Sequence, residues 1–228
     1  MRVYIPTMLL HDVTPPSGDP ATACHILVLH GLGDSKEGWK PVAPELGLAD
    51  AGWIFVQAPD RYYDGFSWFP IPGISGPGIT PAEHATGYRR SRQLLAELID
   101  HLLVELATDA AHLILMGFSQ GCSMAVDQAL RSEHRFGGVL GISGFIGLFD
   151  EYPDGFGAMA REQTLLMTHG VLDDLLPIER TREQVDRLRS FGVQVEWQEY
   201  LKAHGLDPNA EITDLREWLQ ERVSNMAT

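Results

Sequence analysis

Short apolar runs alternate with helical patterns along most of this chain, and this alternation limits the folds open to it. An unbroken apolar run of about four to eight residues is typical of a strand covered on both faces of a sheet. The predicted strands occupy residues 3–10, 25–30, 53–58, 113–117, 139–143, 164–169 and 193–200. The predicted helices start at the Thr80-Pro81-Ala82-Glu83 capping box, at Ser119, at residue 178 and at about residue 209. This order predicts an α/β fold with a mostly parallel central sheet and helices on both faces.

The size and composition of the chain fit one globular domain. The chain has 228 residues, of which 44% are hydrophobic and 21% charged, so fibrous, disordered and transmembrane classes are excluded. We find no internal repeat, low-complexity tract or linker, and therefore expect residues 1–228 to form a single domain.

The net charge limits the partners of the protein. With 31 acidic and 17 basic residues, the formal charge is -14, which disfavours nucleic acid and anionic membrane surfaces as partners. We expect no stable membrane insertion and no nucleic-acid binding, whereas the choice between monomer and homodimer stays open. Pro6 interrupts a very short apolar run, so residues 3–10 are predicted to form a first strand rather than an export signal, which favours a cytoplasmic location.

Residues 59–79 follow neither the helical nor the strand period. They hold four glycines, four prolines and five aromatic residues, and the aromatic residues argue against disorder. A loop of this length inside a domain is usually functional. We expect it near the active site, either as the wall or cover of an apolar substrate pocket or as a flap that only seals the core.

A G-x-S-x-G motif lies between a predicted strand and a predicted helix. Ser119 stands at its centre, and Gly117 and Gly121 remove Cβ atoms that would collide in a sharp turn. This context is typical of a nucleophile elbow, in which the serine hydroxyl is exposed at the carboxyl edge of the sheet. The alternative is a plain tight turn.

A nucleophilic serine needs a base and an acid that orients the base. His204 follows a predicted strand at the carboxyl edge, whereas His134 lies on a charged helix end and His169 precedes the candidate acids. We therefore predict His204 as the general base. The acid is Asp173 or Asp174. These two carboxylates are adjacent, and their spacing along the sequence from the serine and the histidine does not decide between them. Metal binding by His169 with these aspartates is the competing idea, but the chain offers no further ligands nearby, and we expect neither a metal nor a cofactor.

Two backbone N–H groups are candidates for an oxyanion hole. The first belongs to Gln120, directly after the serine, and the second to Leu32 in the glycine-rich segment 30–34. That segment lacks the G-x-G-x-x-G spacing and the lysine of a phosphate-binding loop, so a nucleotide site is not expected.

Together the segments LHGLGDSKEGW, GFSQGC, HGVLDDLLP and YLKAHG resemble the carboxylesterase/phospholipase family related to acyl-protein thioesterases, over residues of about 24–220. The resemblance implies the α/β-hydrolase fold and cofactor-free hydrolysis of esters or thioesters through an acyl-enzyme. It assigns the nucleophile, the acid and the base to Ser119, Asp173 and His204, and the oxyanion donors to Leu32 and Gln120.

The resemblance also implies a pocket for the acyl group of the substrate. Ser67-Trp68-Phe69 is similar to the element of the family beside this pocket, and we expect Phe66, Trp68, Phe69 and Leu176 to line it. Cys122 stands where a glycine is common, and the segment before His204 lacks the usual glycine. The expected function is that of a serine carboxylesterase acting on small esters with an apolar acyl group. Thioesters and lysophospholipids are further substrate classes, and a ligand-binding module with negligible turnover is the alternative.

Overall fold

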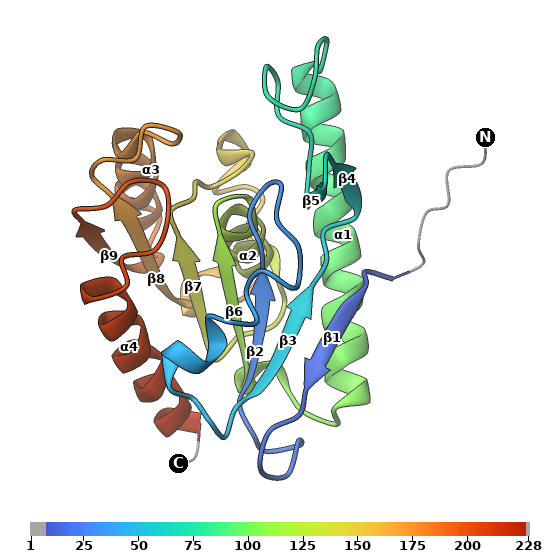
Figure 1. Cartoon of the computed structure of the whole chain (residues 1–228), viewed down its shortest axis with the longest axis vertical. Helices are drawn as coiled ribbons and strands as arrows, with labels where there is room; N and C mark the ends of the chain where they lie inside the picture. The colour runs from blue at the N-terminus through green and yellow to red at the C-terminus, as the bar shows by residue number, and fades with distance from the viewer. Residues whose placement is uncertain (1–7, 227–228) are drawn as a thin grey trace.

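Seven strands form one central sheet in the computed structural model, which describes residues 8–226. The order across the sheet is β1-β3-β2-β6-β7-β8-β9. These strands are β1 (His11–Thr14), β2 (His25–Leu29), β3 (Gly52–Val56), β6 (Leu113–Phe118), β7 (Gly138–Ile142), β8 (Thr164–Gly170) and β9 (Gln194–Tyr200). Only β1 pairs antiparallel, with β3, and the other neighbouring strands run parallel, which confirms the predicted mostly parallel sheet (Figure 1).

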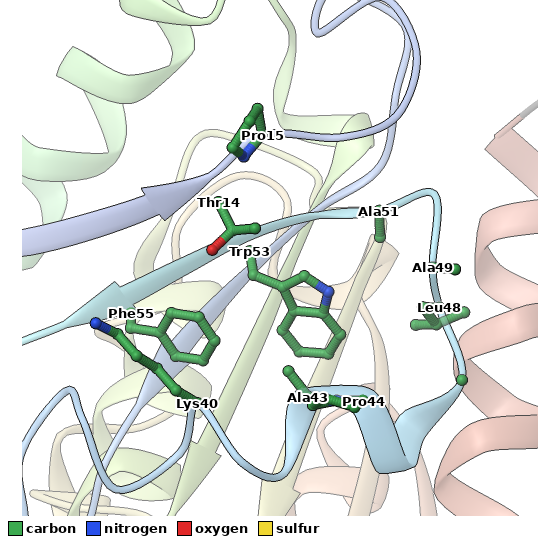
Figure 2. Close-up of a pocket in the computed structure, with 11 residues that line it drawn as sticks. Thr14, Pro15, Lys40, Ala43, Pro44, Leu48, Ala49, Ala51, Trp53 and Phe55 are labelled. Carbon is green, nitrogen blue, oxygen red and sulfur yellow. The ribbon is translucent and has the colours of Figure 1, made fainter.

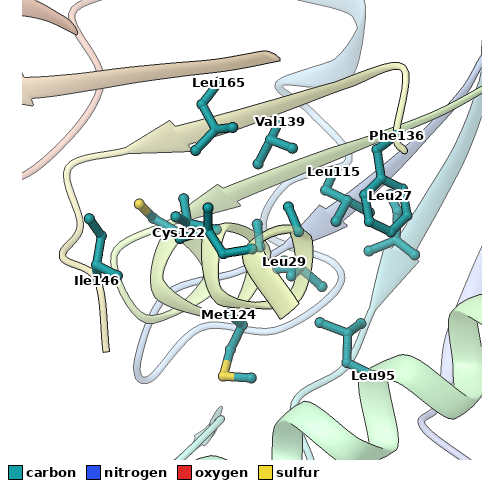
Figure 3. Packing of buried hydrophobic residues seen from close by; sticks show 14 of the residues in the cluster. Leu27, Leu29, Leu95, Leu115, Cys122, Met124, Phe136, Val139, Ile146 and Leu165 are labelled. Atoms are coloured by element: carbon teal, nitrogen blue, oxygen red, sulfur yellow. The ribbon is translucent and has the colours of Figure 1, made fainter. Parts of the chain in front are cut away.

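Helices cover both faces of this sheet, as predicted. They are α1 (Pro81–Glu105), α2 (Gln120–Arg131), α3 (Ile178–Ser190) and α4 (Ala210–Met226). Apolar side chains of α1, α2 and α3 share one core cluster with one face of the sheet. Those of α4 and of the short turn η1 (Ala43–Leu46) pack in a second cluster on the other face. Figure 3 shows how α2 lies against the sheet, with Cys122 and Met124 among the buried side chains.

Local sequence signals explain where α1 begins. Thr80 Oγ1 accepts a hydrogen bond from the Glu83 N–H at 3.2 Å, and the Glu83 carboxylate accepts one from the Thr80 N–H at 2.9 Å. This reciprocal pair is the predicted capping box, and Pro81 occupies the first helical position. No helix within residues 8–226 is both long and apolar enough to cross a membrane.

The first strand was placed too early by the sequence pattern. Residues 8–10 are not in a strand, and residues 3–7 of the predicted strand lie outside the described residues. Instead β1 covers the more polar sequence His11–Thr14, which forms the edge of the sheet. The apolar residue Leu9 lies outside the strand, and its side chain is buried in the core.

The segment 59–79 is also more regular than predicted. It contains an antiparallel hairpin of β4 (Asp60–Tyr62) and β5 (Gly65–Ser67). The hairpin is joined to the segment 30–34, because the Gly33 N–H donates to the Phe66 carbonyl at 2.8 Å and the Phe66 N–H donates to the Asp34 carbonyl at 2.9 Å. The aromatic loop and the predicted oxyanion segment therefore form one connected unit.

Candidate active site

Ser119 occupies a strained turn between β6 and α2. Its backbone has φ 54° and ψ -114°, a positive φ that is uncommon for a residue with a Cβ atom. A Cβ on Gly117 would lie 2.1 Å from the Gly121 carbonyl oxygen, and one on Gly121 would lie 2.0 Å from the Leu29 carbonyl oxygen. Both glycines are thus required by close approach of the backbone, as the motif predicts, and such strain is typical of functional sites.

Three side chains from distant parts of the sequence form a continuous chain of hydrogen bonds at the carboxyl edge of the sheet. His204 Nε2 lies 3.0 Å from Ser119 Oγ, and His204 Nδ1 lies 2.7 Å from Asp173 Oδ2. Asp173 is buried, whereas Asp174 is exposed. The residue brought to His204 is therefore Asp173, and the arrangement has the geometry of a catalytic triad.

The Asp173 carboxylate is held by several further groups. Its Oδ1 accepts hydrogen bonds from the backbone N–H groups of Leu175, at 3.1 Å, and Leu176, at 2.8 Å. His169 Nε2 lies 3.4 Å from Asp173 Oδ2 and donates to the Leu176 carbonyl at 2.8 Å. Burial lowers the pKa of His169, so the ring is neutral and serves as a hydrogen-bond donor.

The metal site weighed for His169 is not found in the part of the chain that the structure describes. No group of three or more histidine, cysteine, aspartate or glutamate side chains there is placed to hold a metal ion. The His169 ring instead bonds the Leu176 carbonyl, approaches Asp173 and packs against the ring of Trp197.

The Leu32 N–H lies in a peptide whose orientation is held by His30. The Nδ1 of His30 donates to the Gly31 carbonyl at 2.7 Å, and its Nε2 accepts from the Ala58 N–H at 3.1 Å. In a trans peptide the C=O and the next N–H point in opposite directions, so this bond directs the Leu32 N–H away from His30. A Cβ on Gly31 would lie 3.4 Å from Ser119 Cβ, which shows how closely the segment approaches the serine.

Within residues 8–226, the N–H groups of Leu32 and Gln120 donate to no protein acceptor. The Gln120 N–H belongs to the first residue of α2, where backbone N–H groups have no partner within the helix. Backbone N–H groups without an acceptor are the donors that a tetrahedral oxyanion requires, so both groups stay candidates for this role.

The side chain of Gln120 has a role that the sequence did not reveal. It is buried, and its Oε1 accepts from the Trp68 N–H at 2.9 Å while its Nε2 donates to the Phe69 carbonyl at 2.8 Å. Trp68 Nε1 in turn donates to the His30 carbonyl at 2.9 Å. These bonds fix the aromatic loop to the start of α2 and to the end of β2.

Two of the four predicted pocket residues have no exposed surface. Trp68 and Phe69 are each 0% exposed and belong to the core cluster, so in this structure they anchor the loop to the core. Phe66 and Leu176 are half-buried and pack against the same cluster, which leaves part of each side chain open. The burial of Trp68 and Phe69 fits a flap that seals the core, whereas the wall of a substrate pocket stays a prediction.

Cys122 fits beneath the elbow because two glycines make room for it. A Cβ on Gly141 would lie 2.7 Å from Cys122 Sγ, and one on Gly144 would lie 2.5 Å from it. Burial raises the pKa of the Cys122 thiol to about 12, so the thiol stays protonated. Cys122 is a small buried side chain of the core.

A cavity of about 480 Å³ lies elsewhere, beside β3 and η1. Figure 2 shows the rings of Trp53 and Phe55 in this cavity, with Ala43 and Pro44 nearby. Its lining includes the loop that enters β3, at the amino ends of the parallel strands, whereas Ser119 follows the carboxyl end of β6. The cavity is therefore separate from the triad.

A nucleophile elbow after a central strand of a mostly parallel sheet, with an acid and a histidine following in that order, defines an α/β-hydrolase. A sequence profile of the family described as phospholipase/carboxylesterase matches residues 11–222. The chain therefore belongs to the phospholipase/carboxylesterase family and is a hydrolase.

Similar proteins agree with this assignment. Acyl-protein thioesterase 1 of Yarrowia lipolytica is 26% identical over 223 residues, which cover 90% of this chain and 95% of that protein. Acyl-protein thioesterase 1 of Schizosaccharomyces pombe is 31% identical over 159 residues, which cover 67% of this chain and 69% of that protein. The crystal structure of esterase PE8 superposes with a TM-score of 0.83 at 20% identity, covering 94% of this chain and 99% of that one, and so shares the fold.

Proposed function

We propose that the protein is a serine carboxylesterase that forms an acyl-enzyme on Ser119. One observation carries the proposal, namely the continuous hydrogen-bond chain from Asp173 through His204 to Ser119, with contacts of 2.7 and 3.0 Å. Membership of the phospholipase/carboxylesterase family supports ester hydrolysis as the reaction.

The proposed first half-reaction is acylation. His204 Nε2 takes the proton of the Ser119 hydroxyl as the serine oxygen attacks the ester carbonyl. Asp173 accepts a hydrogen bond from Nδ1–H, which keeps the tautomer that leaves Nε2 free as a base. The imidazolium then gives its proton to the departing alcohol or thiol.

The proposed oxyanion donors are the N–H groups of Leu32 and Gln120. Each donor of this kind contributes about 3–4 kcal/mol to stabilisation of the transition state in comparable sites. Water then attacks the acyl-enzyme with His204 as base, and the carboxylic acid leaves as Ser119 recovers its proton.

The proposed substrates are small esters with an apolar acyl group, for which Phe66 and Leu176 offer partly open apolar surface. Thioesters are a second proposed class, because two relatives are named acyl-protein thioesterases, and lysophospholipids are a third. Trp68 and Phe69 would contact an acyl chain only if the loop that carries them opens. We also propose a single domain, a cytoplasmic location, and a monomer or homodimer.

The test is hydrolysis of p-nitrophenyl esters from acetate to palmitate by the wild-type protein and by Ser119→Ala. We expect turnover by the wild type, and its loss in a folded Ser119→Ala variant, because that variant lacks the hydroxyl that carries the acyl intermediate. The preferred chain length measures the apolar surface near Phe66 and Leu176. Absence of turnover at every length, with saturable binding of the esters to a folded wild type, would favour a ligand-binding module instead.

A further inference from the structure

A buried carboxylate lies beside the loop that carries His204. The Glu211 side chain is 0% exposed, in the first turn of α4, and lies 2.6 Å from the ammonium group of Lys202 through both of its oxygens. Glu211 also accepts a hydrogen bond from the Thr168 hydroxyl at 2.6 Å and from the Asp207 N–H at 2.9 Å. This carboxylate therefore joins β8, the loop 201–209 and α4 at one point.

The positions of these contacts along the sequence bracket the histidine. Lys202 precedes His204 by two residues and Asp207 follows it by three, and both bind the same carboxylate. Residues 201–209 belong to no helix or strand, so no regular ladder of hydrogen bonds fixes the histidine within this loop. The contacts to Glu211 close the loop on both sides of His204.

The same group of contacts reaches the loop that carries Asp173. Thr168 lies near the end of β8, which leads directly into that loop, and the Leu172 N–H donates to the Lys202 carbonyl at 3.1 Å. A Cβ on Gly170 would lie 2.3 Å from the Lys202 carbonyl oxygen, so the two loops touch. The loops of the acid and of the base are thereby held against one another.

We propose, on the basis of the function proposed above, that Lys202 and Glu211 are positioning residues that hold the His204 loop at the distance the triad requires. Lys202 lies in the segment before His204, which lacks the glycine usual in the family. Its side chain links that segment to α4. Neither residue touches the reacting atoms, and both act through the position of His204.

The energetics favour a positioning role over a purely stabilising one. Burial of two charges costs several kcal/mol, and an apolar pair of similar size is often as stable as a buried ion pair. Burial also lowers the pKa of Lys202, although the Glu211 carboxylate opposes this shift. What the pair provides is a directed geometry, and a misplacement of about 1 Å in a catalytic group can cost on the order of 100-fold in rate.

The test is the double variant Lys202→Met with Glu211→Gln, which removes both charges and keeps the volume and one acceptor oxygen. We expect a folded protein whose kcat on p-nitrophenyl butyrate falls by a factor on the order of 10–100, with KM changed by less than about twofold. A loss of kcat smaller than tenfold in the folded variant would overturn the inference. If the double variant does not fold, Lys202→Gln is assayed instead, and we expect the same loss of kcat with KM nearly unchanged.

The matched control is Tyr200→Phe. The Tyr200 hydroxyl bonds Asp214 at 2.7 Å and so also joins β9 to α4, but it does not bind the His204 loop. We expect this variant to keep the kcat of the wild type. An equal loss of kcat in Tyr200→Phe would show that any loosening of α4 has the effect, and would refute a specific role for Lys202 and Glu211.

A second readout does not depend on turnover. The proton between His204 Nδ1 and Asp173 gives a low-field NMR resonance, which we expect in the wild type and in Tyr200→Phe and expect to be lost in the double variant. Its persistence in the double variant would contradict the inference even if the wild type hydrolysed no ester. Absence of ester turnover by the wild-type protein would instead refute the proposed function.

Discussion

The Gln120 side chain allows a quantitative test of how the aromatic loop is attached. In Gln120→Leu the buried Trp68 N–H loses its acceptor, which costs about 1–3 kcal/mol. The Phe69 carbonyl keeps the Ser67 hydroxyl as a donor at 2.8 Å, so loss of the glutamine N–H there costs only about 1 kcal/mol. We therefore expect the free energy of unfolding to fall by about 2–4 kcal/mol, which for a chain of this length lowers the Tm by roughly 5–15 °C.

Gln128 provides a matched control on the same helix. It is also buried, but its Oε1 has no hydrogen-bond partner within the described residues. Gln128→Leu removes an amide that gains little from folding, so we expect no loss of stability or a small gain. Both free energies are measured by urea unfolding. A loss below about 0.5 kcal/mol for Gln120→Leu, or equal losses for the two variants, would refute the argument.

Further predictions concern the elbow and the acid stability. Gly121→Ala places a Cβ 2.0 Å from the Leu29 carbonyl oxygen, so we expect the free energy of unfolding to fall by at least about 2 kcal/mol and most ester turnover to be lost. In the control Gly18→Ala the new Cβ has nothing within 4 Å, and we expect stability and turnover to stay unchanged. A Gly121→Ala variant as stable as the wild type would contradict this prediction. Burial lowers the pKa of His30 and of His169 below 6.5 in the folded protein. Below pH 6.5 the unfolded chain therefore binds more protons than the folded chain, and the free energy of unfolding falls as the pH drops toward the folded-state pKa values. The fall is up to about 1.4 kcal/mol per pH unit for each ring. Urea unfolding between about pH 8 and pH 5 measures this slope, and a free energy of unfolding that rises over the acid part of the range would oppose it.

The central sheet could be predicted because its strands are covered on both faces. The inner strands among them are mostly apolar, so the runs at residues 25–30 and 113–117 could be recognised without further information. The edge strand β1 has the polar sequence His11–Thr14, so nothing in its pattern separates it from a loop. The β4–β5 hairpin was missed because each of its strands has only three residues and its further pairing is with a loop distant in the sequence.

The grouping of Ser119, His204 and Asp173 could be predicted because chemistry and chain order limit the choices. The base had to follow both the serine and the acid and to lie past the end of a strand; His204 met these conditions, whereas His169 precedes the acid. The choice of Asp173 over Asp174 needed the family resemblance, since adjacent carboxylates differ only in which one the fold buries.

Two features of the site left no signal in the sequence. Glu211 resembles an ordinary acidic residue in the first turn of a helix, and only the structure shows that its side chain is buried against Lys202. The Trp68 and Phe69 side chains were predicted to face substrate, but their direction depends on contacts with Gln120 and His30 that no local pattern encodes.

The most direct test of the account is to identify the residue that reacts with an acylating or phosphonylating reagent. The folded protein is treated with a fluorophosphonate, and the modified peptide is located by mass spectrometry. We expect one adduct per chain, on Ser119, formed much more slowly in His204→Ala because the base that activates the hydroxyl is gone. An adduct on another residue, or a rate in His204→Ala equal to that of the wild type, would contradict the proposal that Ser119 is the nucleophile and His204 its base.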